Sequence, residues 1–258
     1  MRIGICKLCL QQGKLQKSHF IPSAFYKYIL SPSEGNPNPV LVGPRVTATT
    51  SRQVRDYLLC AECEDLFNKN GEQAIVKWVW NGKDFPLGNR LAVAHQHFTF
   101  SKALVFSGRA IGIDVEKISY FALSVIWRAA VHQWDLMFGD KSTLLDLGKT
   151  EEPIRQYLHG DADFPDQVAI TATVCTDRTS MTFYPPCRAT DIPHTAFGFL
   201  ALGIHFLVYV GDKIPLAVRQ TCFMKSDHQL LFQRDCSEKI FHAYAELMKT
   251  SKLAKGLD

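Results

Sequence analysis

Apolar residues recur at helical spacing in two long stretches of the chain. Between residues 61 and 80 they form one stripe that includes Phe67 and Ile75. Residues 115–138 are apolar on nearly all sides, and Asp114 stands before them as a candidate N-cap. We therefore predict an amphipathic helix in the first stretch and a buried, central helix in the second.

Shorter apolar runs, several of them with alternating polar positions, indicate strands. These runs cover residues 90–101, 102–114, 168–175, 180–184, 197–202, 204–210, 217–224 and 228–233. Further helical patterns cover residues 23–30, 151–160 and 237–256. Residues 31–52 read as a long loop with one short strand. The stretch 195–211 contains His205 and three glycines, so buried strands explain it better than a membrane span.

These elements predict an α+β fold in two parts. We expect a small module at residues 1–82 and, at residues 83–258, an α+β domain with a mostly antiparallel sheet and a central buried helix. A chain of 258 residues with 47% hydrophobic composition is long enough for this arrangement. The first residues contain no apolar run behind basic ones, so we expect no targeting peptide and a cytoplasmic location without a membrane partner.

Basic residues concentrate in the first part of the chain. Residues 1–112 contain fourteen Lys and Arg against seven Asp and Glu, whereas residues 113–258 contain fifteen against eighteen. The first thirty residues include Lys14, Lys17 and Lys27 and no acidic residue. This asymmetry has two explanations of equal weight. Either the N-terminal module binds a nucleic acid, or its basic residues form a face that is exposed to solvent.

Four of the eight cysteines form two C-x-x-C pairs, Cys6/Cys9 and Cys60/Cys63. A tight turn places both sulfur atoms of a pair on one side, and two pairs supply the four thiolates of a structural zinc site. The first pair precedes a predicted hairpin and the second stands at the start of a predicted helix. This order predicts a treble-clef module. The remaining cysteines have no ligand spacing and are expected to be buried thiols: Cys175, Cys187, Cys222 and Cys236.

Three motifs carry a resemblance to a known family. CKLC at residue 6, SHFIP at residue 18 and LLCAECEDLFN at residue 58 are similar to motifs of the zinc-containing, four-cysteine branch of the HNH, or ββα-metal, nucleases. In that family a hairpin ends in Asp-His-Ile-Ile-Pro and a helix begins with Cys-x-x-Cys-His. The resemblance implies divalent-metal-dependent cleavage of DNA or RNA, in a bacterial or phage-related protein such as an effector of anti-phage defence that acts with a partner protein.

The resemblance also assigns roles to residues. It implies that His19 is the general base that takes a proton from the attacking water. Ser18 stands where the family has a metal-binding Asp, Glu64 where it has a metal-binding His, and Asn68 where it often has a second His or Asn. Since Glu64, Asn68 and Glu72 are spaced four residues apart, we expect their oxygen atoms on one helix face, as ligands of a catalytic Mg²⁺ or Mn²⁺.

Several basic residues are candidates for contact with nucleic acid. Lys14, Lys17 and Lys27 flank His19 in the sequence and would contact phosphates. Arg128 lies in the otherwise apolar central helix, so it is either a further phosphate contact or half of a buried ion pair that joins the two parts.

A second class of function stays open. In a non-catalytic zinc module that binds nucleic acid or a protein partner, His19 is a structural histidine of the hairpin and Glu64 interacts with the helix dipole.

His95 and His97 alternate on a predicted strand without a third metal ligand nearby in the sequence, so we expect histidines without a metal there.

Overall fold

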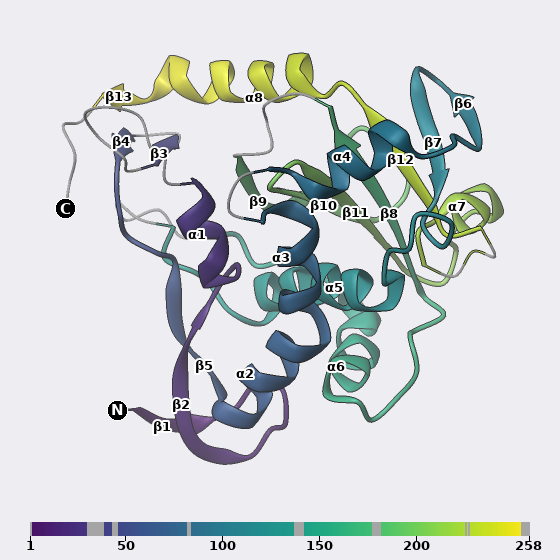
Figure 1. Cartoon of the computed structure of the whole chain (residues 1–258). Helices are drawn as coiled ribbons and strands as arrows, with labels where there is room; N and C mark the ends of the chain where they lie inside the picture. The colour runs from purple at the N-terminus through teal and green to yellow at the C-terminus, as the bar shows by residue number, and fades with distance from the viewer. Residues whose placement is uncertain are drawn as a thin grey trace.

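The computed structural model of the chain describes residues 2–29, 39–42, 46–81, 84–136, 142–176, 182–224, 226 and 228–253. Figure 1 shows a small sheet near the N-terminus, a larger sheet on the other side of the molecule, and helix α5 between the two. The fold is mixed α+β with mostly antiparallel strands, as the sequence predicts. In the described part of the chain, no helix is both long and apolar enough to cross a membrane.

The N-terminal part is built on a three-stranded antiparallel sheet in the order β1–β2–β5. Its strands are β1 (Arg2–Ile5), β2 (Gln12–His19) and β5 (Arg55–Cys60). Pro22 follows β2 and leads into helix α1 (Ser23–Ile29), as predicted, because proline is compatible with a helix start but not with a continuing strand.

The loop predicted at residues 31–52 contains two short strands instead of one. They are β3 (Val40–Val42) and β4 (Val46–Thr49), which pair with each other, while residues 31–38 and 43–45 lie outside the described residues. Strand β13 (Lys252–Leu253) adds to β4 in parallel. The last strand thereby joins the first part of the chain.

The helix predicted over residues 61–80 is present but is interrupted by a π-helical turn. It consists of α2 (Ala61–Phe67), the π turn (Asn68–Glu72) and α3 (Gln73–Val79). Gly71 lies in the turn and packs directly on α5, where an added Cβ atom would lie 2.9 Å from the backbone of Phe121. Only glycine permits this close approach of two helices.

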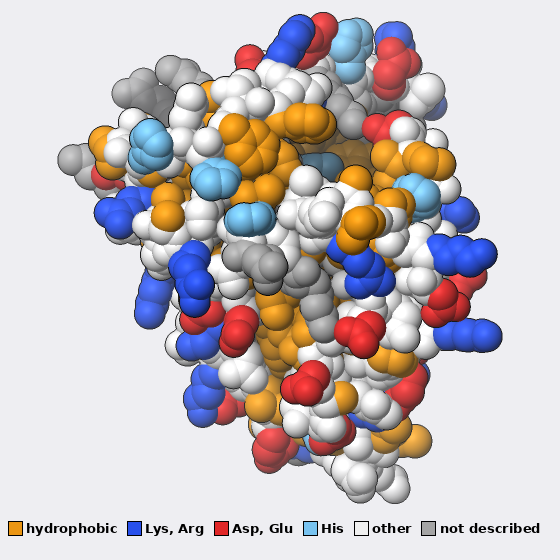
Figure 2. Space-filling model, turned by 90° about the vertical axis from the view of Figure 1, so that its right-hand side faces the viewer, with side chains coloured by type: hydrophobic (Ala, Val, Ile, Leu, Met, Phe, Trp, Pro, Cys, Tyr) orange, Lys and Arg blue, Asp and Glu red, His pale blue; other side chains and the backbone are white. Residues whose placement is uncertain are grey.

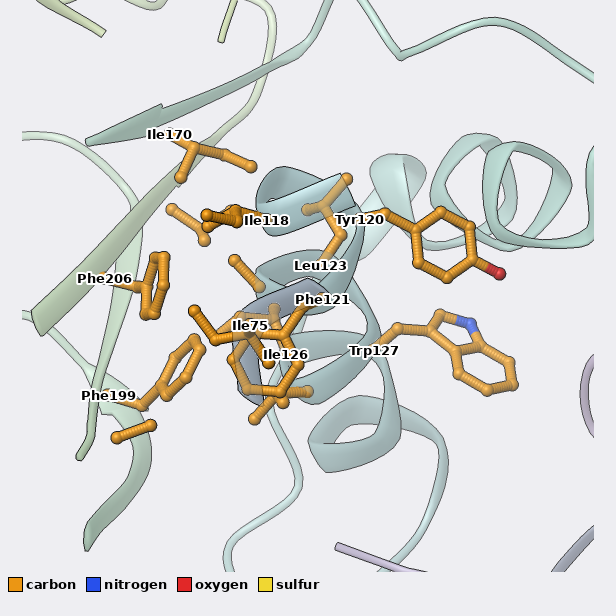
Figure 3. Packing of buried hydrophobic residues seen from close by; sticks show 14 of the residues in the cluster. Ile75, Ile118, Tyr120, Phe121, Leu123, Ile126, Trp127, Ile170, Phe199 and Phe206 are labelled. Carbon is orange, nitrogen blue, oxygen red and sulfur yellow. The ribbon is translucent and has the colours of Figure 1, made fainter. Parts of the chain in front are cut away.

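Helix α5 (Val115–Val131) is the centre of the fold. Asp114 caps it by accepting a hydrogen bond from the backbone N–H of Lys117, as predicted. Nearly every residue of the helix is buried, and Phe121 packs against Phe199 and Phe206 of the larger sheet (Figure 3). The helix ends at Val131 instead of near residue 138.

The larger sheet has seven strands in the order β6–β7–β12–β8–β11–β10–β9, and only the β12–β8 pair is parallel. The strands are β6 (Phe98–Phe100), β7 (Ala103–Ser107), β8 (Val168–Cys175), β9 (Phe183–Arg188), β10 (Ala196–Ala201), β11 (Ile204–Val210) and β12 (Leu230–Arg234). β10 and β11 confirm that the stretch 195–211 forms strands. Helix α6 (Glu151–His159) is also as predicted.

Two strand predictions are wrong. The run 90–101 begins inside helix α4 (Pro86–Val93), which buries Leu87 and Leu91 at helical spacing, and only its end forms β6. The run 217–224 begins with the short surface helix α7 (Leu216–Thr221). In both cases apolar residues at the end of a helix and in the following loop imitated the alternation of a strand.

One hydrophobic core extends through both parts of the chain. Its buried residues include Cys6 and Phe67 from the first part and Trp127 and Phe206 from the second. Helix α8 (Ser237–Thr250), predicted from its pattern, runs along the top of Figure 1 from the large sheet back to β3 and β4. The packing is therefore continuous across the boundary predicted at residue 82.

Candidate functional site

The two C-x-x-C pairs come together at one end of the N-terminal sheet. Cys6 and Cys9 lie in the turn after β1, Cys60 ends β5, and Cys63 lies in the first turn of α2. The four sulfur atoms lie within 4.8 Å of one another and can hold a metal ion. Leu10, with φ of 63°, completes the first turn by donating its backbone N–H to the carbonyl of Cys6.

Hydrogen bonds among the four residues concentrate negative charge on Cys6. Its pKa is lowered to about 4, first by a hydrogen bond from the Cys63 thiol and then by backbone N–H groups, including that of Cys60, whose nitrogen lies 3.3 Å from the Cys6 sulfur. The same hydrogen bond raises the pKa of Cys63 far above its usual range, and burial raises that of Cys60 to about 11. A thiolate fixed by N–H donors is a prepared ligand for a cation.

His19 is held by a residue that the sequence did not single out. Its Nε2 atom lies 2.7 Å from Oε1 of Gln53, just before β5, and its ring centroid lies 6.2 Å from that of Tyr26. Because the amide oxygen can only accept, Nε2 carries a proton and Nδ1 is left to accept one. Gln53 is distant in sequence and belongs to no motif, so only the fold brings it to His19.

Ser18 points away from His19 into the protein. Neighbouring residues of a strand face opposite sides, and the Ser18 side chain is fully buried, where its hydroxyl oxygen accepts a hydrogen bond from the backbone N–H of Leu59 at 3.2 Å. The position that resembles the metal-binding Asp of HNH nucleases therefore stabilises the β2–β5 pair.

The three oxygen ligands expected on one helix face have different surroundings. Asn68 is exposed at the start of the π turn, whereas Glu72 accepts a hydrogen bond from Arg128 at 2.6 Å. Glu64 has one buried oxygen, Oε1, without a hydrogen-bond partner among the described residues. Asn68 still follows Glu64 at α-helical spacing, since its backbone N–H donates to the Glu64 carbonyl, and the π turn spans the five residues from Asn68 to Glu72. In the described part of the chain, His19, Glu64 and Glu72 form no second metal-binding group.

Arg128 forms the internal ion pair that the sequence left open as an alternative. Its side chain is 1% exposed, pairs with Glu72, donates to the Phe20 carbonyl at 3.5 Å and lies 4.7 Å from the centre of the Phe67 ring. A guanidinium group buried in this way cannot reach a phosphate. Arg128 is therefore not a nucleic-acid contact in this fold; it joins α5 to the first part of the chain.

Basic and aromatic side chains share one face of the β2–β5 pair. Lys17 is paired with Tyr57 and His19 with Arg55, and residues directly opposite each other lie on the same face. Arg2 of β1 joins them, since its guanidinium carbon lies 5.9 Å from the centre of the Tyr57 ring. We call these five residues the basic face.

The other two predicted lysines, Lys14 and Lys27, are also exposed. Lys14 lies on β2, where it is paired with Ile3 of β1, and a register shift in the β2–β5 pairing lies between it and Lys17; Lys27 lies on α1. The only acidic residue of β5, Asp56, is paired with Ser18 and contacts His132 at 3.1 Å. No carboxylate of β2 or β5 therefore belongs to the basic face.

The remaining candidates are dispersed. His95 and His97 are exposed and precede β6 rather than alternating on it, and the His97 ring lies 5.9 Å from that of His228. Cys175 and Cys222 are buried as expected, whereas Cys187 is exposed.

On the side opposite the N-terminal sheet, Figure 2 shows Lys and Arg interspersed with Asp and Glu rather than a patch of one charge sign.

Comparison with known proteins adds no assignment to this geometry. No family model, curated protein or solved structure matches the chain. The side chains themselves are therefore the basis for any statement about function.

Proposed function

We propose that residues 1–82 form a treble-clef module that holds one structural zinc ion and binds nucleic acid through the basic face. The observation that carries this proposal is the row of Arg2, Lys17 and Arg55 around Tyr57, with no carboxylate from β2 or β5 among them. Such a row attracts the phosphate backbone of DNA or RNA without regard to sequence.

The donor set supports zinc as the metal. Four thiolates bound to zinc at about 2.3 Å in a tetrahedron lie about 3.8 Å apart, and the sulfur atoms of Cys9 and Cys60 are separated by 3.9 Å. Four sulfur ligands leave no open position for a substrate, so the ion would support the fold and take no part in chemistry. The expected role of zinc is to fix β1, β5 and α2 to one another.

Charge reversal tests the nucleic-acid interface. The double variant Lys17→Glu/Arg55→Glu should weaken binding and reduce the slope of log Kd against log salt concentration by roughly two, one unit for each lost phosphate contact. The matched control, Lys249→Glu/Lys252→Glu, makes the same change of charge near the C-terminus. Equal losses in both variants would show that only net charge matters and would reject this interface.

A second candidate function is phosphodiester hydrolysis of the HNH type. The observation that favours it is the hydrogen bond from His19 to Gln53, which leaves Nδ1 as a base at the end of a hairpin. Oε1 of Glu64, which is buried and has no hydrogen-bond partner among the described residues, is a further acceptor on α2, and Asn68 is exposed one turn later. A bound Mg²⁺ or Mn²⁺ would supply charge stabilisation to the phosphate. In this candidate His19 accepts the proton of the attacking water.

A further inference from the structure

We propose that the basic face binds nucleic acid as a single strand and that Tyr57 stacks on one of its bases. This inference rests on the proposed function and adds to it the form of nucleic acid that the face accepts.

Two cations lie over the ring of Tyr57. The ammonium nitrogen of Lys17 is 5.7 Å from the ring centroid, and the guanidinium carbon of Arg2 is 5.9 Å from it. Neither residue forms an ion pair with a carboxylate within the described residues. Two like charges that approach one ring repel each other, and an anion placed between them relieves that repulsion.

The sheet holds the ring more firmly than it holds the cations. Tyr57 is half-buried and lies on β5, directly opposite Lys17 on β2, and β1 with Arg2 follows on the other side of β2. Lys17 and Arg2 are exposed, so their long side chains can leave the ring without disturbing the core. The ring is therefore a fixed platform with two mobile charges above it.

A double helix would use the charges of this face but not its aromatic ring. In a duplex each base is covered by its neighbours, and only phosphates and sugars reach a flat surface. A single strand exposes unpaired bases, which stack on aromatic side chains with little dependence on sequence. When a base covers Tyr57, Lys17 and Arg2 move from the ring to the phosphates on either side. His19 and Arg55 extend the contact surface along the bound nucleic acid.

Fluorescence anisotropy with the full chain tests this arrangement. The probes are labelled single-stranded DNA and RNA of about 12 nucleotides and the corresponding blunt duplexes, all at one salt concentration. We expect the single strands to bind about tenfold more tightly than the duplexes, and Tyr57→Leu to remove that difference. Tyr57→Phe should retain it, because the ring is preserved. Phe100→Leu removes an exposed aromatic ring from β6 and is the matched control.

An abasic oligonucleotide makes the test independent of the stability of any variant. It carries the same phosphates without bases, so wild-type protein should bind it about tenfold more weakly than the normal strand. Equal binding of the abasic and normal strands, or of single strands and duplexes, overturns the stacking proposal. If the Lys17→Glu/Arg55→Glu variant binds every probe as well as wild type does, the proposed interface itself is wrong, irrespective of Tyr57.

Discussion

Burial and pairing decide what a polar residue does in this protein, as Glu72 illustrates. Its place in the sequence predicts a metal ligand, yet in the fold it neutralises Arg128, a cation that is 1% exposed. A buried charge is tolerated only when it is paired, so this carboxylate is committed to the interior. His19 is the opposite case, because its hydrogen bond to Gln53 leaves one ring nitrogen available.

The ion pair leads to a stability prediction. Arg128→Met should lower the free energy of unfolding by about 3 kcal/mol, because it leaves Glu72 partly buried without a partner. Arg52→Met is the matched control, since its pair with Asp135 is more than half exposed and is worth at most about 1 kcal/mol. Urea unfolding followed by tryptophan fluorescence measures both. Similar losses in the two variants would contradict a special role for the buried pair.

His19 decides between the two candidate functions. If the protein hydrolyses phosphodiesters, His19→Ala should slow cleavage at least about a hundredfold while zinc content and melting temperature stay unchanged. His159→Ala is the control, because His159 contacts Asp161 on the surface of α6. The assay compares single- and double-stranded DNA and RNA with Mg²⁺ or Mn²⁺. Wild-type protein that cuts none of them eliminates hydrolysis and leaves binding as the function, whereas a fully active His19→Ala variant rejects His19 as the general base.

At the scale of elements, the π turn between α2 and α3 is the feature with the largest effect on the site. It brings Gly71 against the backbone of α5 and Glu72 against Arg128. It also contains Asn68 and Glu72, two of the three residues whose oxygen atoms were expected on one helix face. A π turn of this kind inserts an extra residue locally, and here the close packing on α5 accounts for its position.

Substitution of Gly71 tests this account of the turn. Gly71→Ala places a methyl group 2.9 Å from the Phe121 backbone and should destabilise the protein by about 1–3 kcal/mol. Gly13→Ala is the control, because no atom of the described part of the chain lies within 4 Å of the Cβ atom that it would add. Thermal unfolding compares the two. A Gly71→Ala protein as stable as the control would mean that α5 moves freely away from the turn.

At the scale of the whole molecule, the core does not separate into two units. Trp134 of the second part stacks on Phe20 of the first, with ring centroids 5.0 Å apart, and the buried cluster continues from Cys6 to Phe206. The four-cysteine group lies at one end of this shared core. A change at the four-cysteine group should therefore affect the stability of the whole fold.

Metal removal should consequently destabilise the entire chain. We expect one zinc ion per chain, and we expect Cys60→Ala to lose it and to lower the melting temperature by about 10 °C. Tryptophan fluorescence and circular dichroism should still report a single transition, because both parts share the core. Cys187→Ala, which changes an exposed thiol outside the group, should keep the zinc and the melting temperature. Two separate transitions would contradict a common core.

Local spacing in the sequence determined most of the elements and the four-cysteine group. The apolar patterns predicted α5, α6, α8 and the strands β8, β10, β11 and β12, and the C-x-x-C pairs predicted the four-cysteine group. Periodicity and tight turns are properties of neighbouring residues, so they can be recognised without the fold. The patterns wrongly predicted strands at α4 and α7, because apolar residues at a helix end and in the following loop resembled the alternation of a strand.

Only the tertiary structure decided which distant residues meet. Lys17 faces Tyr57 because of the β2–β5 register, and Gln53 reaches His19 across 34 positions of the chain. Glu72 meets Arg128, 56 positions away, because the π turn packs on α5. Register and helix packing depend on the burial of the complete core, and no local pattern encodes them. The sequence by itself therefore determined the two cysteine pairs and most helices and strands of this protein, whereas the fold decided that Lys17 lies beside Tyr57 on the basic face and that Arg128 lies inside.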